Sequence, residues 1–195
     1  AAGRAGAWTL AFVNAHALDL CARDAAAAAA FDAADLLLRD GTGMALLMHL
    51  ARRDPGPDLN GTDLIPRLAA GRRVALYGAR PGVAEAAARA LAPLGARVVA
   101  ARHGFHPSEA YRRWIAEDAR PEAEGGRGAE LVILGFGMPL QERLAMELRA
   151  AAPGPVGIVC GGAVLDFLSG RAPRAPRAMR RAGLEWAFRL AREPR

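Results

Sequence analysis

The chain contains no lysine, although 26 of its 195 residues are basic: all 26 are arginine. Alanine, arginine, glycine and proline are abundant and have GC-rich codons, so codon usage explains the missing lysine. The absence nevertheless excludes some chemistry. The chain has no GxxxxGK[ST] phosphate-binding loop and no GxGxxG dinucleotide fingerprint. It also cannot hold the Tyr-x-x-x-Lys pair of nucleotide-sugar dehydrogenases and epimerases.

The chain also has few cysteines and no long apolar run. Its two cysteines, Cys21 and Cys160, lie in apolar stretches, which argues against a disulfide framework. The longest apolar runs, near residues 131–140 and 156–165, reach about half of the roughly 20 residues that a spanning helix needs. No secretory leader opens the sequence. We therefore expect a cytoplasmic protein that does not cross a bilayer.

The charges are unevenly distributed along the chain. Residues 1–170 hold 18 Arg and 18 acidic residues, whereas residues 171–195 hold 8 Arg and two Glu. The net charge of +6 therefore lies in the last 25 residues. This predicts a neutral domain over residues 1–170 and a basic appendage over residues 171–195. The appendage would meet a local anionic partner such as a membrane surface, a lipid phosphate or RNA.

The appendage has a helical pattern over residues 177–192. Apolar residues recur there every three or four positions, while Arg174, Arg177 and Arg181 fall on another side. Two interpretations stay open. In the first, the helix packs on the core and its polar face is exposed to water. In the second, it lies in a membrane interface, where each Arg near an anionic leaflet adds on the order of 1 kcal/mol to the binding free energy.

Short apolar runs alternate with longer amphipathic stretches along the rest of the chain. They predict strands at residues 8–13, 36–38, 74–77, 98–101, 131–134 and 156–159. Helices are predicted at residues 15–34, 44–51, 63–69, 83–91, 108–117 and 140–151, the fifth with Ser108 as its N-cap. This alternation implies an α/β fold with a Rossmann-like, mostly parallel sheet and helices on both faces.

Ligands of such sheets bind beyond the carboxyl ends of the strands. Five loops are expected there, at residues 14–16, 40–43, 78–82, 135–139 and 161–162, and four of them are rich in glycine, which lets a backbone approach a ligand closely. The loops at 78–82 and 135–139 also lead into helices, whose N-termini suit a diphosphate.

Asp40 directly follows a short apolar strand, which should direct its carboxylate into the crevice above the sheet. One interpretation is an Asp-Gly turn with no further role. The other is a general base for a substrate hydroxyl, because an ordinary Asp is ionised at neutral pH.

No metal site is predicted from the sequence. His103 and His106 stand three apart without a nearby Cys or acidic partner, and His16 and His49 are isolated. There is no Asp-x-Asp motif either. An enzyme of this kind would have to meet diphosphate charge with backbone N–H groups and arginine, whose guanidinium fits phosphate well.

Seven segments carry a resemblance that covers nearly the whole chain. They are residues 12–16 (FVNAH), 39–43 (RDGTG), 60–64 (NGTDL), 77–82 (YGARPG), 135–142 (GFGMPLQE), 161–170 (GGAVLDFLSG) and 183–186 (GLEW). In this order and spacing they resemble the WecG/TagA/CpsF family of bacterial glycosyltransferases.

The resemblance implies an inverting, metal-independent transferase without a cofactor and with a glycosyltransferase-E-like fold. Its donor would be a nucleotide sugar, classically the UDP derivative of N-acetylmannosamine. Its acceptor would be a polyprenyl-diphosphate-linked saccharide at the cytoplasmic face of the bacterial plasma membrane, in exopolysaccharide or teichoic-acid assembly. The partners implied are these substrates and an anionic membrane surface, with no nucleic acid. Whether the chain forms a homo-oligomer stays open.

The resemblance also assigns roles to individual residues. Asp40 matches the catalytic base, and Gln141 matches a polar residue in the substrate pocket. The substrate-binding residues would be Asn14, Thr42, Gly61, Thr62, Asp63, Gly78, Arg80, Gly82, Gly135, Gly137, Pro139, Glu142, Gly161, Gly162 and Asp166. The residues that meet the lipid diphosphate or the membrane would be Arg171, Arg174, Arg177 and Arg181.

Two positions depart from the teichoic-acid branch of the family. Phe12 stands where Thr is expected, and Asp58 stands where Arg is expected, so the chain looks more like the exopolysaccharide branch and N-acetylmannosamine is one candidate donor among related hexoses. The chain ends at Arg195, where relatives often continue, which predicts a shortened appendage. The alternative function is a nucleotide-binding module without chemistry, whose basic tail docks on RNA or another partner.

Overall fold

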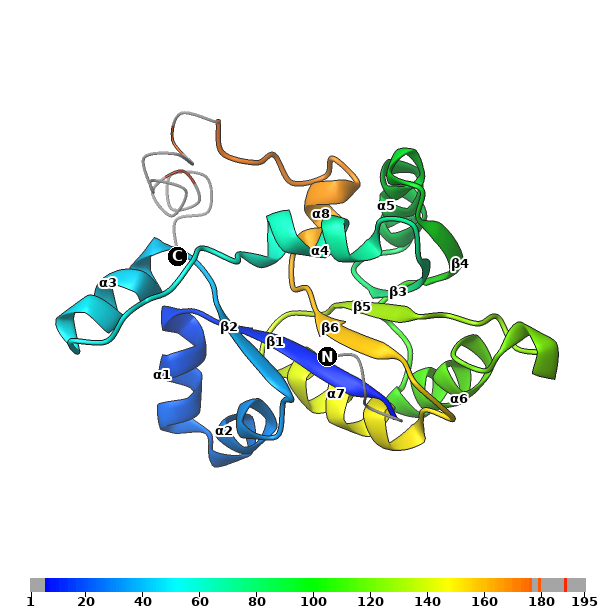
Figure 1. Ribbon diagram of the computed structural model, residues 1–195, viewed down its shortest axis with the longest axis horizontal. Helices are drawn as coiled ribbons and strands as arrows, with labels where there is room; N and C mark the ends of the chain where they lie inside the picture. Colours follow the sequence, from blue (N-terminus) through cyan, green and yellow to red (C-terminus); the bar gives the residue numbers. More distant parts are fainter. Residues whose placement is uncertain (1–5, 177–178, 180–187, 189–195) are drawn as a thin grey trace.

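The computed structural model describes residues 6–176 together with residues 179 and 188. One parallel sheet of six strands lies at the centre of these residues (Figure 1). Its strand order is β2-β1-β6-β5-β3-β4. The strands are β1 (Trp8–Val13), β2 (Leu36–Arg39), β3 (Arg73–Gly78), β4 (Arg97–Arg102), β5 (Leu131–Gly135) and β6 (Gly157–Cys160). The α/β class and the parallel sheet are thereby confirmed.

Helices cover both faces of the sheet. Figure 1 shows α4, α5 and α8 over one face and α1, α2, α6 and α7 over the other. The α-helices are α1 (Ala15–Arg23), α2 (Ala25–Asp32), α3 (Thr42–Leu50), α4 (Gly61–Ala69), α5 (Val83–Leu91), α6 (Ser108–Asp118), α7 (Leu140–Ala151) and α8 (Val164–Leu168). Two 3-10 turns, η1 (Ala92–Leu94) and η2 (Glu122–Glu124), complete the described elements.

Each face of the sheet has its own hydrophobic core. Phe31, Tyr111 and Leu148 belong to the core under α2, α6 and α7. On the opposite face, Ile65 and Leu165 belong to the core under α4 and α8. The strands between the two cores are almost continuously apolar, as expected for a parallel sheet that is buried on both sides.

The structure differs from the sequence prediction at several helix boundaries. The helix predicted over residues 15–34 is two helices, because the Asp24 carboxylate accepts hydrogen bonds from the backbone N–H groups of Ala26 and Ala27 and caps α2. Ser108 is not an N-cap: α6 begins at Ser108 itself, after Pro107, without a side-chain cap. Helix α8 was not predicted. The helical pattern at 177–192 falls outside the described residues except at positions 179 and 188.

A buried polar network fixes the side of the sheet next to α6. The fully buried Asp118 accepts a hydrogen bond of 2.6 Å from the hydroxyl of Tyr77 on β3. Its two carboxylate oxygens also accept bonds of 2.9 and 3.0 Å from Arg102 on β4, and Arg127 lies 3.0 Å away. Burial, followed by the charge of Asp118, raises the pKa of Tyr77 above its ordinary value of 10.0. Tyr77 is therefore a permanent hydrogen-bond donor to Asp118 at physiological pH.

Candidate active site

A pocket of about 100 Å³ opens above the carboxyl ends of β1, β2 and β6. Val13, the last residue of β1, lies opposite Arg39, the last residue of β2. On the other side of β1, Leu10 lies opposite Val159, so β6 ends about two residues earlier than β1. The residues that line the pocket are Phe12, Asn14, Asp40, Gly61, Thr62, Met138, Gln141, Cys160, Gly161, Gly162, Ala163, Val164 and Phe167. Seven of the predicted site residues, Asn14, Asp40, Gly61, Thr62, Gln141, Gly161 and Gly162, are thus brought together.

Asn14 and Asp40 occupy equivalent positions on neighbouring strands. Each follows the last residue of its strand, and the backbone N–H of Asp40 donates to the carbonyl of Val13 at 2.9 Å, which extends the pairing by one residue. The side-chain oxygen of Asn14 caps α1 by accepting a bond of 3.0 Å from Ala17. The amide NH2 of Asn14 is the half of that side chain that can serve the pocket, beside the carboxylate of Asp40.

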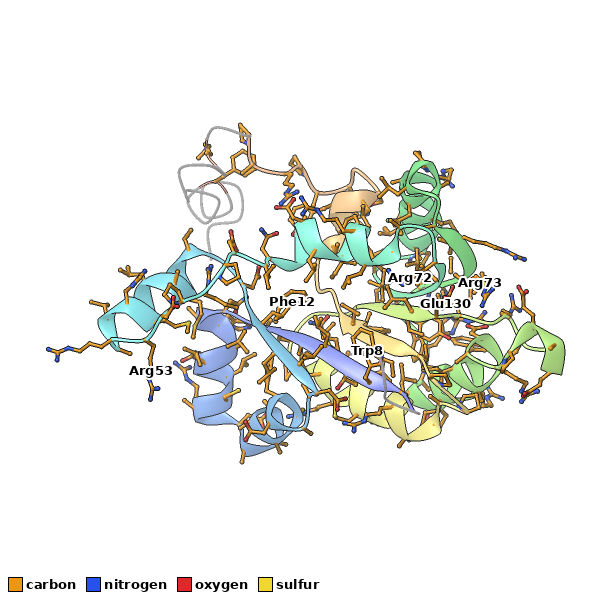
Figure 2. All side chains as sticks on the ribbon, in the orientation of Figure 1. Trp8, Phe12, Arg53, Arg72, Arg73 and Glu130 are labelled. Carbon is orange, nitrogen blue, oxygen red and sulfur yellow. The ribbon has the colours of Figure 1, made fainter. Side chains whose placement is uncertain are left out.

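Phe12 forms the apolar floor of the pocket. Its side chain is almost fully buried and lies between β1 and α4, as Figure 2 shows. A Cβ atom at Gly61 would come within 3.2 Å of the Phe12 ring, so the first residue of α4 must be small. The glycine of the Gly-Thr-Asp motif therefore brings Thr62 over the pocket by allowing α4 to pack directly on Phe12.

Asp63 has its carboxylate engaged outside the pocket lining. Asn60 caps α4 by accepting a bond of 3.0 Å from the backbone N–H of Asp63, and its amide donates to Asp63 Oδ2 at 3.0 Å. Arg174 donates to Asp63 Oδ1 at 2.7 Å. Asp63 thus holds the start of the appendage against the first turn of α4, and its substrate role stays a prediction.

Gln141 ties two walls of the pocket together. It lies in the first turn of α7 and is almost fully buried. Its side-chain oxygen accepts a bond of 2.8 Å from the backbone N–H of Gly162, and its amide donates to Glu142 Oε1 at 2.8 Å. Burial raises the pKa of Glu142 above its ordinary value of 4.5. Glu142 itself is absent from the pocket lining, so its contribution there passes through Gln141.

Three of the predicted glycines are required by packing. A Cβ atom at Gly78 would overlap the backbone of Gly135, at the point where β3 and β5 end side by side. One at Gly135 would lie 2.7 Å from Leu165, and one at Gly161 would lie 2.5 Å from Val164. These glycines bring the strand ends and α8 into close contact, which by itself accounts for their presence.

The two remaining Gly-rich turns lead into α5 and α7. Gly82, in the left-handed region with φ 82°, directly precedes α5, and Pro139 directly precedes α7. Neither helix has a side-chain cap. The N–H of Val83 donates to the carbonyl of Arg80 and that of Gln141 to the carbonyl of Gly137, and the other N–H groups of the first turns can meet an anion. Arg80 is exposed in the first of these turns, and Gly137 has φ 84° in the second. None of these residues lines the pocket, nor does Thr42 at the start of α3.

The described part of the appendage lies along α4 and α8. Arg171 Nε is 3.6 Å from Asp166 Oδ1, and Arg174 pairs with Asp63. Both Arg side chains are thus held against acidic groups of the domain. The other two arginines predicted to meet the lipid, Arg177 and Arg181, lie outside the described residues.

Several lining residues were not predicted as site residues from the sequence. Met138 lies within the loop at residues 135–139, and Ala163, Val164 and Phe167 follow the loop at residues 161–162. The signal for them was their place in the segments 135–142 and 161–170 that carry the family resemblance. Cys160 ends β6 inside the pocket. Burial, and then the charge of Glu142, raises the pKa of its thiol well above 9.0, so it is a neutral, unreactive part of the wall.

Neither a cluster of metal ligands nor a membrane-spanning helix is present among the described residues. Among the residues that the structure describes, no three His, Cys, Asp or Glu side chains gather so that they could hold a metal ion. Over the same residues, no helix is long and apolar enough to span a bilayer.

The fold and the pocket place the chain among Rossmann-like α/β proteins, which bind ligands over the carboxyl ends of parallel strands. The whole chain, residues 1–195, matches the family described as "Glycosyl transferase WecG/TagA/CpsF family". The chain therefore belongs to this family and is a glycosyltransferase of cell-surface polysaccharide synthesis. The family uses nucleotide-sugar donors and lipid-linked acceptors. Membership favours the enzymatic interpretation over a nucleotide-binding module without chemistry.

Proposed function

We propose that the protein is an inverting, metal-independent glycosyltransferase. It moves N-acetylmannosamine or a related hexose from a nucleotide-sugar donor, with UDP as the first candidate, to a polyprenyl-diphosphate-linked saccharide. The observation that supports this best is the pairing of Asp40 with Asn14 at the mouth of a pocket whose opposite wall is fixed by Gln141.

Asp40 acts as the general base in this proposal. Its carboxylate takes the proton of the acceptor hydroxyl while the hydroxyl oxygen attacks the anomeric carbon of the donor. The new C–O bond forms on the face opposite the nucleotide diphosphate, whose own bond to the anomeric carbon breaks. The electron pair leaves with the diphosphate, and the anomeric configuration inverts in one step.

The diphosphate charge is met without a metal. The Gly-rich turns before α5 and α7 begin at the carboxyl ends of β3 and β5, which are neighbours in the sheet. Both helices begin without a side-chain cap. Their first-turn N–H groups and Arg80 supply the charge complementarity that a leaving diphosphate needs. Further Arg residues of the appendage, Arg177 and Arg181 among them, meet the acceptor diphosphate and the inner leaflet of the plasma membrane.

Phe12 sets part of the donor preference. An aromatic ring at the pocket floor offers no hydrogen bond to the sugar, whereas the Thr expected in the teichoic-acid branch would offer one. Thermal-shift measurements with UDP- and GDP-linked sugars would identify the donor, because a ligand at 100 times its Kd stabilises by about 2.7 kcal/mol.

Asp40→Asn is the decisive test. The variant should lose at least about 100-fold in transfer rate, the lower end of what general-base catalysis contributes, while its unfolding midpoint stays close to that of the wild type. The measurement is transfer of radiolabelled sugar to a polyprenyl-diphosphate-linked acceptor. A variant that keeps most of its activity would remove Asp40 from the mechanism.

Metal independence is tested in the same assay. EDTA should leave the transfer rate unchanged, and inhibition that a divalent cation reverses would contradict metal independence.

A further inference from the structure

An apolar helix projects from the protein directly after the proposed catalytic base. The α3 segment (residues 41–55) leaves the sheet at Asp40, and its helix α3 has the sequence TGMALLMHL with no buried residue. Leu46 is 61% exposed and Leu50 is 73% exposed, the highest values among the leucines that the structure describes. Figure 1 shows α3 extending away from the sheet, and it has no extensive contact with another described helix or strand.

The fold anchors this segment at its base. Arg39, whose side chain is only 10% exposed, donates from Nη1 to the carbonyl of Gly41 at 3.0 Å and from Nε to the carbonyl of Pro55 at 2.9 Å. One guanidinium therefore joins the two ends of the segment. Asp58, 3.9 Å from Arg39, adds a counter-charge. The fold therefore holds α3 in its exposed position, since the residues on either side of the helix are fixed by Arg39.

The outer end of the segment is basic. Arg52 and Arg53 follow the helix as exposed residues, the latter labelled in Figure 2. The one acidic residue of the segment, Asp54, accepts a hydrogen bond of 2.9 Å from the backbone N–H of Gly56. Arg52 has φ 54° and occupies the left-handed position that ends α3, with its N–H bonded to His49 and that of Arg53 bonded to Met48. Glycine is the favoured residue at this position. The chain therefore keeps a cation where backbone conformation favours glycine.

We propose that the α3 segment docks on an anionic bilayer surface. Exposed Leu side chains next to Arg suit the boundary between acyl chains and headgroups, where the Arg side chains reach lipid phosphates. A second copy of the chain is a poorer fit. A nine-residue helix is only about 14 Å long, so its exposed face is much smaller than the roughly 800 Å² that each partner buries in a standard interface.

The biological purpose of this docking rests on the proposed transferase function. Because Asp40 lies immediately before the α3 segment, a bilayer that holds α3 would also hold the base close to lipid headgroups. An acceptor diphosphate in that bilayer would then be presented at the mouth of the pocket. The contact is additional to the basic appendage and comes from the other end of the chain.

The test measures binding of the full-length chain to vesicles. Sedimentation would use phosphatidylcholine vesicles with and without about 30% phosphatidylglycerol, an anionic lipid whose negative surface potential attracts Arg side chains. The wild type should prefer the anionic vesicles. Arg52→Gly combined with Arg53→Ala should weaken binding about 30-fold, at about fivefold for each Arg. Arg52→Gly relieves the left-handed strain, so weaker binding cannot be attributed to unfolding. Leu46→Ser with Leu50→Ser should weaken binding to a similar degree.

Matched controls remove equivalent groups elsewhere. Arg89→Ala with Arg120→Ala deletes two exposed Arg, and Leu94→Ser deletes a leucine that is 46% exposed; both should bind within about twofold of the wild type. Unchanged binding by the α3 variants would overturn the proposal. So would a wild-type dimer that these variants dissociate while vesicle binding persists, because α3 would then be a self-association surface.

Transfer assays separate this proposal from the proposed function. With a short-chain, water-soluble lipid-diphosphate acceptor and no vesicles, the α3 variants should transfer sugar at the wild-type rate. With the acceptor embedded in vesicles they should be slower. If even the wild type transfers no sugar, the proposed function fails. The docking proposal is then still decided by the vesicle-binding result. Equal losses with both acceptors would mean that α3 acts on the active site and would overturn the docking role.

Discussion

Replacing Gln141 with leucine tests whether this side chain fixes the pocket wall. Gln141 is 1% exposed, and leucine has a similar volume and no polar atoms. The change therefore removes hydrogen bonds without opening a large cavity. The backbone N–H of Gly162 loses its acceptor, and Glu142 Oε1 loses its donor. Both groups then lie buried without those partners.

The expected loss of stability follows from these two bonds. A neutral amide-to-backbone hydrogen bond contributes about 0.5–1.5 kcal/mol, and one to a charged group contributes about 1.5–3 kcal/mol. Gln141→Leu should therefore lower the free energy of unfolding by about 2–4.5 kcal/mol. The transfer rate should fall about 100-fold as well, because Gly161 and Gly162 form the wall of the pocket and a displacement of about 1 Å there is enough for such a loss.

Urea unfolding at pH 7, followed by tryptophan fluorescence, measures the first quantity, and the radiolabelled transfer assay measures the second. Gln141→Glu is the matched control: it keeps an acceptor for Gly162 but sets a second carboxyl against Glu142, so the pair must share a proton and the variant should lose stability as the pH rises. A Gln141→Leu variant that loses activity but less than about 1 kcal/mol of stability would refute a wall-fixing role. Gln141 would then act on the substrate itself.

Two further predictions concern buried groups. Tyr77→Phe removes a donor to the fully buried carboxylate of Asp118, which Arg102 also contacts, and should cost about 1.5–3 kcal/mol in urea unfolding. A loss below about 1 kcal/mol would argue against a charge-assisted bond between Tyr77 and Asp118. The raised pKa of Glu142 means that the native state holds this proton to higher pH than the unfolded chain, so ionisation of Glu142 destabilises the fold as the pH rises from 4.5 through the native pKa. Glu142→Gln should gain stability over the wild type across that window and keep the gain above it; unfolding curves at pH 4 to 8 that run parallel would contradict this.

The sequence predicted the architecture well because strands buried on both sides leave a clear signal. All six strands are present, and the helices predicted at residues 83–91 and 140–151 match α5 and α7 at both ends. The break at Asp24 was missed because a run of alanines carries no periodicity that could reveal two helices. There, one side-chain cap outweighs the helical propensity of the alanines.

The site was predicted in part. Asn14 and Asp40 could be placed together because both directly follow strands of a parallel sheet. The role of Gly78 and Gly135 was less accessible, because only the strand order shows that β3 and β5 end against each other. The bond between Asp63 and Arg174 joins residues 111 positions apart, and nothing local in the sequence indicates it.

The pairing of β1 with β2 has a consequence for how this enzyme can vary. Neighbouring strands lie about 4.8 Å apart, a spacing set by backbone hydrogen bonds. Because Asn14 and Asp40 each directly follow a strand end, the pairing of the strands sets their separation. The helices α1 and α2, which connect them in the chain, do not set it. Insertions or replacements within α1 and α2 can therefore accumulate in homologues or be engineered into this chain, while the reacting groups keep their spacing.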